Sequence, residues 1–113
     1  MKFRWLRFWW QRRTRGWDDS ETWGLDTSLA RLILPRLRRF REIGAVTATP
    51  VNYCLFDASG DITAEANDAW LRDIGAMIAA FEWVGAANRD DTHAGDHQPG
   101  FDLFAKHYLS LWW

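Results

Sequence analysis

Two long segments carry apolar side chains at the spacing of an α-helix, and this pattern constrains the fold more than any other feature. The first segment spans about residues 27–43 and stops at Gly44, the residue type that most often follows a helix. Its apolar stripe consists of Leu25, Leu29, Leu32, Ile33, Leu37, Phe40 and Ile43. Because residues three and four apart share one face of a helix, we expect this stripe to face a core.

Local signals mark the start and the middle of this first helix. Asp26, Thr27 and Ser28 are alternative N-caps, since their side-chain oxygens can accept hydrogen bonds from free backbone N–H groups. Pro35 lacks a backbone donor and clashes with the preceding turn, so we expect a kink near residues 31–35.

The second segment spans about residues 64–87 and is apolar on two sides. One face carries Ala66, Trp70, Ile74, Met77, Ile78, Phe81, Val84 and Gly85, and a weaker face carries Ala69, Ala76, Ala80 and Trp83. We therefore expect this helix to be central or to contact a neighbouring subunit. A third helix is predicted over about 100–112, with its inward stripe formed by Phe101, Phe104, Ala105, Tyr108 and Trp112.

The remaining segments connect or precede these helices. Residues 1–15 are predicted to form a helix, residues 44–63 a loop packed over the core, and residues 88–100 a polar loop. The prediction is a single all-α domain over residues 1–113: a small bundle of three main helices, an N-terminal aromatic and basic segment, and a long middle connection.

Charge is distributed unevenly along the chain although the net charge is only −1. Residues 1–43 hold 11 Lys and Arg against 5 Asp and Glu, whereas residues 44–113 hold 3 against 10. Such a division can be compensated within one fold, can pair two subunits head to tail, or can leave a basic patch for an anionic partner. The acidic half disfavours binding of a long nucleic acid.

Tryptophan is unusually frequent, with nine residues in 113. Trp9-Trp10 and Trp112-Trp113 are adjacent pairs, so one ring of each pair must point away from the core of its own chain, which favours a homo-oligomer or a partner surface. Arginine with tryptophan in residues 1–15 also suits a membrane interface. Because that segment lacks a clean amphipathic pattern, we expect its aromatic residues to dock against the bundle.

Cysteine content and hydropathy bear on the compartment. Cys54 is the only cysteine, which excludes an intramolecular disulfide and fits a reducing cytoplasm. No apolar run reaches the roughly 18 residues that a membrane span needs.

Arg36 is the most distinctive single residue, because on an unbroken helix it projects into the apolar stripe of residues 25–43. A buried guanidinium needs an anionic partner, which could be an internal carboxylate, from Glu82, Asp73 or Asp26, or a bound anion. The alternative is that the Pro35 kink turns Arg36 toward solvent.

Further candidate ligand-binding residues flank Arg36: Trp17, Trp23, Arg31, Arg38 and Arg39. The two tryptophans bracket an acidic turn and could staple it to the bundle or stack on a planar ligand, while the arginines could line a solvated helix face or take phosphates. The acids of the turn, Asp18, Asp19 and Glu21, are expected to cap and to pair with arginines rather than to collect a cation; Asp18 and Glu21 have the spacing of a capping box.

Signals for metal binding and catalysis are weak. His93 and His97, with nearby aspartates, have ligand chemistry, but Gly95 and Pro99 indicate a loop and no zinc-protease glutamate lies between the histidines. Asp57 to Asp61 resembles a calcium loop only in part. No phosphate-binding glycine loop or nucleophile motif occurs, so we expect no catalytic residues, no metal and no cofactor.

The chain resembles a family of small, largely uncharacterised proteins encoded by tailed bacteriophages. The resemblance rests on residues 17–23, 25–26, 33–40, 70–82, 100–108 and 111–112. It implies a phage accessory protein in the host cytoplasm, where such proteins often blunt host defences by sequestering nucleotide signals or by binding a defence protein. We therefore expect a non-enzymatic, oligomeric protein that captures an anionic small molecule such as a nucleotide second messenger; the alternative is a module that binds and inhibits a host or phage protein.

Overall fold

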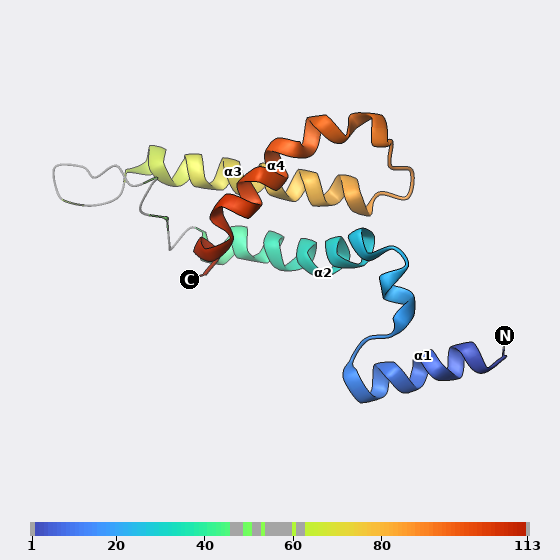
Figure 1. Ribbon diagram of the computed structural model, residues 1–113. Coiled ribbons are helices and arrows are strands. Elements are labelled where there is room, and N and C mark those ends of the chain that lie inside the picture. Colours follow the sequence, from blue (N-terminus) through green and yellow to red (C-terminus); the bar gives the residue numbers. More distant parts are fainter. Residues whose placement is uncertain (1, 46–48, 51–52, 54–59, 61–62, 113) are drawn as a thin grey trace.

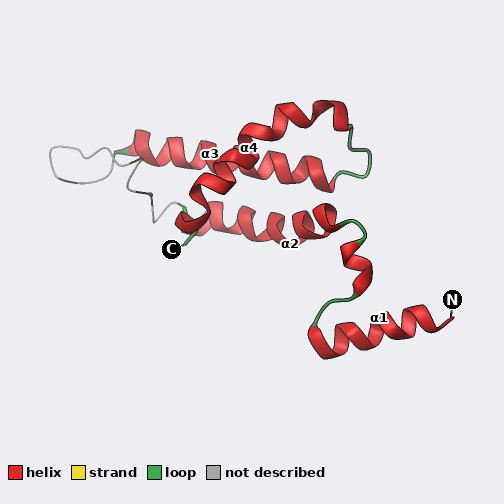
Figure 2. Cartoon of the chain, viewed as in Figure 1, coloured by secondary structure: helices red, strands yellow, loops and turns green. Residues whose placement is uncertain are grey.

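The computed structural model describes residues 2–45, 49–50, 53, 60 and 63–112. All regular structure in these residues is helical, which confirms the predicted all-α bundle (Figures 1 and 2). The four α-helices are α1 (Lys2–Arg15), α2 (Leu25–Arg39), α3 (Ala64–Gly85) and α4 (Ala94–His107). Short turns extend them: η1 (Asp19–Thr22), η2 (Phe40–Gly44), η4 (Asp91–His93) and η5 (Tyr108–Ser110).

Helix α3 is the centre of the bundle, as its two apolar faces predict. It packs against α2 on one side and against α4 on the other, and α4 crosses it obliquely (Figure 1). Trp70, Ile74 and Met77 are completely buried, and Ala80 on the second face is buried as well. Thr63 caps the helix by accepting a hydrogen bond from the Ala66 N–H. The core therefore consists of α3 with one face each of α2 and α4.

Helices α3 and α4 approach closely at Gly100. A Cβ atom at this position would lie 2.5 Å from the Ala76 carbonyl oxygen and 2.8 Å from the Ala80 Cβ. No real Cβ tolerates these distances, so the small residues Ala76, Ala80 and Gly100 set the spacing of the two helices.

The face that α2 presents to the core differs from the predicted one. Ala30 and Leu37 are buried, with Ile33, Leu34 and Phe40 packed beside them, whereas Leu25, Leu29 and Leu32 are 44–51% exposed. The predicted stripe was thus right for its C-terminal half and wrong for its first two turns. The physical reason is that α3 packs on the side of α2 that carries Ala30 and Leu37, and within the described residues only the short turn η1 lies beside the first leucines.

One local prediction for α2 needs correction. The helix begins at Leu25 with Gly24 as its N-cap and no side-chain cap, so Asp26, Thr27 and Ser28 do not cap it. Pro35 lies inside the continuous helix, and the kink near residues 31–35 stays a prediction. At Phe40 a single π-helical turn begins that leads to the buried Gly44.

Helix α4 starts earlier than predicted, and it turns a different set of side chains toward the core. Asp90 accepts a hydrogen bond from the Thr92 N–H and caps η4, so the helical region begins within the predicted polar loop. After α4 the chain tightens into η5, which leaves Tyr108 and Trp112 61% and 68% exposed. The inward prediction is confirmed for the packed rings of Phe101 and Phe104 and wrong for Ala105, Tyr108 and Trp112.

Helix α1 has the predicted secondary structure but not the predicted position. Among the elements that the structure describes it packs only against η1, and it lies apart from the bundle (Figure 1), which gives the molecule an elongated shape of 67 × 35 × 19 Å. Trp5, Trp9 and Trp10 are 51–63% exposed, so the expected docking of these rings on the bundle is wrong.

Most of the predicted middle connection, with Cys54 and the partial calcium motif of residues 57–61, lies outside the described residues, as does Trp113. Tyr53 is described and packs against the Trp70 ring. Within the described residues, no helix combines the length and the apolar character that crossing a membrane requires.

Substitution of Gly100 by alanine tests the close helix crossing. We expect Gly100→Ala to lower the free energy of unfolding by about 1–3 kcal/mol, because the added methyl group overlaps the Ala76 carbonyl. Gly95→Ala is the matched control in the same helix, where a Cβ meets nothing within 4 Å. Urea unfolding of both variants measures the difference; equal stability of the two would refute the close crossing.

Candidate functional site

The acidic turn, residues 17–23, connects α1 to α2 and is built around a buried carboxylate. Asp18 is fully buried and caps η1 by accepting a hydrogen bond from the Ser20 N–H, while Glu21 accepts one from the Asp18 N–H at 2.7 Å. This reciprocal arrangement is the capping box that the sequence predicts. Gly16 leads into the turn with φ +85°, a left-handed conformation suited to glycine.

Hydrogen bonds from Ser20 contribute most to lowering the pKa of Asp18, and the guanidinium of Arg12 assists them. Arg12 forms an ion pair with the Asp18 carboxylate across the joint between α1 and the turn. The carboxyl group thus stays ionised in a buried position because donors and a cation surround it.

One face of α1 is held to the acidic turn by polar contacts. Arg7, Gln11 and Arg15 lie one helical turn apart, and all three contact Asp19, with Gln11 Nε2 at 2.8 Å and Arg15 Nη2 at 2.6 Å. The Gln11 side chain also accepts a hydrogen bond from the Asp19 N–H. These contacts confirm that the acids of the turn pair with arginines. These contacts lower the pKa of Asp19 to about 2, with the hydrogen bond from Gln11 as the largest contribution and that from Arg15 as the next.

Trp17 and Trp23 border the turn and stack with arginines of the same chain. The Arg15 guanidinium lies 3.7 Å from the Trp17 ring centre, and the Arg4 guanidinium lies 4.3 Å from that of Trp23. Phe8 meets Trp23 edge to face at 5.5 Å. The tryptophans therefore fasten α1 to the turn, although both remain 44–63% exposed.

Arg36 is exposed, so the expected buried guanidinium with an anionic partner is wrong. Its Nη1 donates a hydrogen bond to the Leu32 carbonyl at 2.7 Å. The reason is the rotation of α2: Arg36 continues the exposed side of Leu25, Leu29 and Leu32 instead of entering the core. The carboxylates proposed as its partners are engaged elsewhere: Glu82 with Arg38, Asp26 with Arg89, and Asp73 with Tyr53.

The other arginines of α2 point in different directions. Arg38 pairs with Glu82 on α3 at 3.1 Å, and Arg39 pairs with Glu42 at 2.9 Å on the surface. Arg31 is exposed and forms no ion pair within the described residues. Of the six predicted ligand residues, the structure brings Arg36 and Arg39 to one groove and leaves Trp17, Trp23, Arg31 and Arg38 outside it.

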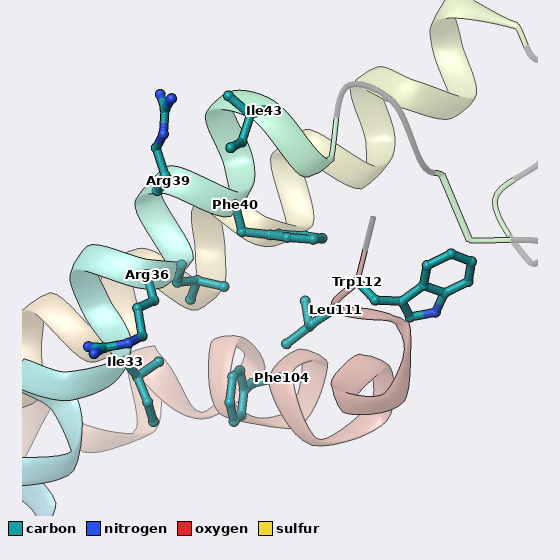
Figure 3. A pocket seen from close by; sticks show the side chains of 9 residues that line it. Ile33, Arg36, Arg39, Phe40, Ile43, Phe104, Leu111 and Trp112 are labelled. Carbon is teal, nitrogen blue, oxygen red and sulfur yellow. The ribbon is translucent and has the colours of Figure 1, made fainter.

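This groove, which we call the α2–α4 groove, has a volume of about 660 Å³ and is mostly apolar. Figure 3 shows the Phe40 ring directed toward Leu111 and Trp112, with Phe104 across from them. Arg36 reaches along the rim beside Ile33, and Arg39 points away from the apolar side chains. The remaining lining residues are Leu37 and Ile43.

Sequence reasoning missed the contribution of the chain end to this groove. Phe104 was expected in the core and Trp112 was expected to point inward, but Trp112 lies at the groove with two thirds of its surface exposed. The adjacent Trp112-Trp113 pair was the available signal, since two neighbouring rings cannot both enter one core.

A second polar cluster joins the middle connection to α3 and α4. The Tyr53 hydroxyl donates a hydrogen bond to the Asp73 carboxylate and lies 2.9 Å from His107 Nε2. Burial lowers the pKa of His107, while burial and then the neighbouring Asp73 raise the pKa of Tyr53. His107 is buried and its ring packs against Trp70, so the cluster has the character of a structural tie without an open substrate position.

The histidine cluster does not assemble into a metal site. His97 stacks on Trp83 at 4.9 Å, and His93 contacts Asp90 and Asp96 on the surface. Among the described residues, no three side chains of the metal-binding types are grouped closely enough to hold an ion.

Comparisons with protein-family models, with curated proteins and with solved structures found no match to this chain. The α2–α4 groove and the surfaces around the acidic turn therefore provide the basis for a functional proposal.

The attachment of α1 to the acidic turn should depend on pH. The contacts of Asp19 hold its pKa near 2 in the folded chain, below the ordinary value of 3.8. The ionised Asp19 carboxylate therefore stabilises the attachment of α1 fully above about pH 4, and this contribution is lost as the pH falls toward 2. NMR indole signals of Trp17 and Trp23 should shift over this range. Asp19→Asn should show those shifts already at neutral pH, and Asp68→Asn, an exposed change on α3, should not.

Proposed function

We propose that the protein binds an anionic small molecule with a flat or apolar part in the α2–α4 groove. The observation that carries this proposal is the combination of an apolar, aromatic groove with a guanidinium at its rim that has no carboxylate partner among the described residues. Ligand sites typically combine a largely apolar lining with a few polar groups that fix orientation.

Two arginines have different parts in this proposal. In the described part of the chain Arg36 is held by the Leu32 backbone carbonyl, so an anion can replace that contact without leaving a buried charge unpaired. Arg39 is paired with Glu42 on the exposed surface, where an ion pair contributes little, so it can turn toward a bound anion at small cost. Phe40, Phe104 and Trp112 would cover the flat part of the ligand.

A nucleotide second messenger fits this chemistry, because its phosphates suit arginine and its bases suit aromatic rings. Together with the resemblance to small phage proteins, this supports the proposal of a phage accessory protein that acts against host defence as a nucleotide sponge in the host cytoplasm. Binding without turnover is proposed, because the groove lining includes no carboxylate or histidine that could act as a general base.

Calorimetric titration with cyclic dinucleotides and ADP-ribose derivatives tests the proposal. We expect at least one of them to bind, and Arg36→Ala to weaken that ligand by about 10-fold or more, because charged hydrogen bonds contribute about 1.5–3 kcal/mol each. Trp112→Ala should weaken it as well. Arg72→Ala is the matched control, since Arg72 is an exposed arginine outside the groove.

The absence of heat with every ligand would contradict the proposed function. Equal weakening by Arg36→Ala and Arg72→Ala would also contradict it, because it would indicate a general charge effect instead of a site.

The second candidate function is a protein-interaction module, and the exposed aromatic side of α1 favours it. Trp5, Trp9 and Trp10 are more than half exposed on a helix that contacts only the acidic turn. Large aromatic residues are the residues that most often anchor protein interfaces. A host or phage protein would be the inhibited partner, and assembly into a homo-oligomer is the other use of such a surface.

A pull-down from host lysate distinguishes this candidate from the ligand-binding protein. Loss of a captured protein in Trp5→Ser but not in Arg36→Ala would favour the interaction module. Capture of no protein by the wild-type chain would favour the groove.

A further inference from the structure

The uncovered side of α1 carries five exposed apolar side chains, and we call this side the aromatic face. It consists of Phe3, Trp5, Leu6, Trp9 and Trp10, which are 47–81% exposed. These residues lie on the side of the helix opposite Arg7, Gln11 and Arg15, which contact the acidic turn. Helix α1 therefore uses its polar side within the chain and leaves its apolar side without a partner in the described residues.

The arrangement prevents α1 from folding back over its own bundle. Turning the aromatic face inward would break the contacts of Asp19 with Arg7, Gln11 and Arg15 and the ion pair of Arg12 with Asp18. Because Asp18 is completely buried, the loss of Arg12 would leave its carboxylate without a cation. No element of the described residues covers an aromatic face fixed in this way, so the face is open to a second chain.

A second uncovered apolar surface lies on α2, on the side that the predicted core stripe was expected to bury. Leu25, Leu29 and Leu32 are 44–51% exposed there. With Trp17 and the neighbouring turn residues they line a groove of about 490 Å³, which we call the leucine groove. Glu21 is one of the polar residues that line the leucine groove. The cation on the aromatic face of α1 is Arg13, whose guanidinium lies over the Trp9 ring.

The sizes of the two surfaces fit a dimer. Large aromatic side chains bury roughly 150–250 Å² each, so the four rings of the aromatic face, at 51–81% exposure, offer about 500 Å² per chain. Two reciprocal contacts would bury about 1,000 Å² of ring surface together with a smaller area of the two leucine grooves, which exceeds the roughly 1,000 Å² that a specific interface needs.

An anionic membrane suits the aromatic face less well. Three arginines of α1 that could meet lipid phosphates, Arg7, Arg12 and Arg15, are paired with Asp18 and Asp19 of the acidic turn. Of the arginines in α1, Arg13 alone approaches a ring of the aromatic face. Interfacial membrane helices instead depend on cations beside their apolar face.

We infer that the aromatic face of α1 packs into the leucine groove of a second copy, and that the two copies exchange their α1 helices reciprocally about a two-fold axis. This inference rests on the self-association named above as a use of the aromatic face, and it is independent of the ligand proposed for the α2–α4 groove. The exchange also explains how α1 is stable. A helix of 14 residues is marginal in water unless it packs against another surface, and the second copy supplies that surface.

Sedimentation equilibrium of the full chain tests the exchange. We expect the wild-type chain to show twice its mass of 13.2 kDa. The double variant Trp5→Ser/Trp9→Ser should raise the dimer dissociation constant about 100-fold or more, because buried aromatic anchors dominate interfaces. The double variant Leu29→Ser/Leu32→Ser should raise this constant by a similar factor, because it changes the α2 side of the same contact. Tyr108→Ser, an equally exposed aromatic residue outside both surfaces, is the control. Circular dichroism confirms that each variant keeps its helices.

Disulfide formation distinguishes exchange between copies from closure within one chain. In a Cys54→Ser background, mixing Leu6→Cys with Leu29→Cys should give a mixed disulfide dimer, whereas mixing Leu6→Cys with Tyr108→Cys should not.

Three outcomes would overturn the inference. The first is a monomeric wild-type chain at tens of micromolar concentration. The second is an intramolecular disulfide as the main product of the Leu6→Cys/Leu29→Cys double variant. The third is a monomer that binds vesicles of phosphatidylglycerol and phosphatidylcholine through α1, which would assign the aromatic face to a membrane. Calorimetry with nucleotides decides the ligand proposal separately.

Discussion

The buried carboxylate of Asp18 is the interaction on which the rest of the structure depends. It caps the acidic turn through Ser20, and with Arg12 it joins α1 to that turn. Asp19 adds contacts from the same side of α1. Because these contacts use the polar side of the helix, the aromatic face points outward, and the first turns of α2 stay uncovered. One ionised group thus determines which apolar surfaces a partner can reach.

The periodic part of the fold was predictable because it depends on local patterns. The spacing of Trp70, Ile74 and Met77 placed α3 in the centre, and the Asp18–Glu21 spacing predicted the capping box. The rotation of α2 was not predictable in this way. Leu25, Leu29 and Leu32 have the composition of a core stripe, and nothing local reveals that no helix of the described residues covers them.

The candidate site shows the same limit. The sequence placed Arg36 within the apolar stripe of residues 25–43. This position predicts a buried guanidinium only if the leucines of the stripe are themselves buried. Their exposure moves Arg36 to the rim of the α2–α4 groove, beside Phe104 and Trp112 from the distant end of the chain. Contacts between α2 and residues 104–112 depend on how α4 crosses α3, which Gly100 permits and which no pattern in α2 encodes.

The most direct test of this account is the distance between α1 and α2 measured by pulsed electron spin resonance. Spin labels at Thr14 and Arg31, both exposed, in a Cys54→Ser chain diluted with unlabelled protein, should give one narrow distance within the chain. Asp18→Ala should broaden it, because α1 then loses its fixed orientation. A broad distribution in the wild-type chain, or a narrow one that survives Asp18→Ala, would contradict the central role of Asp18.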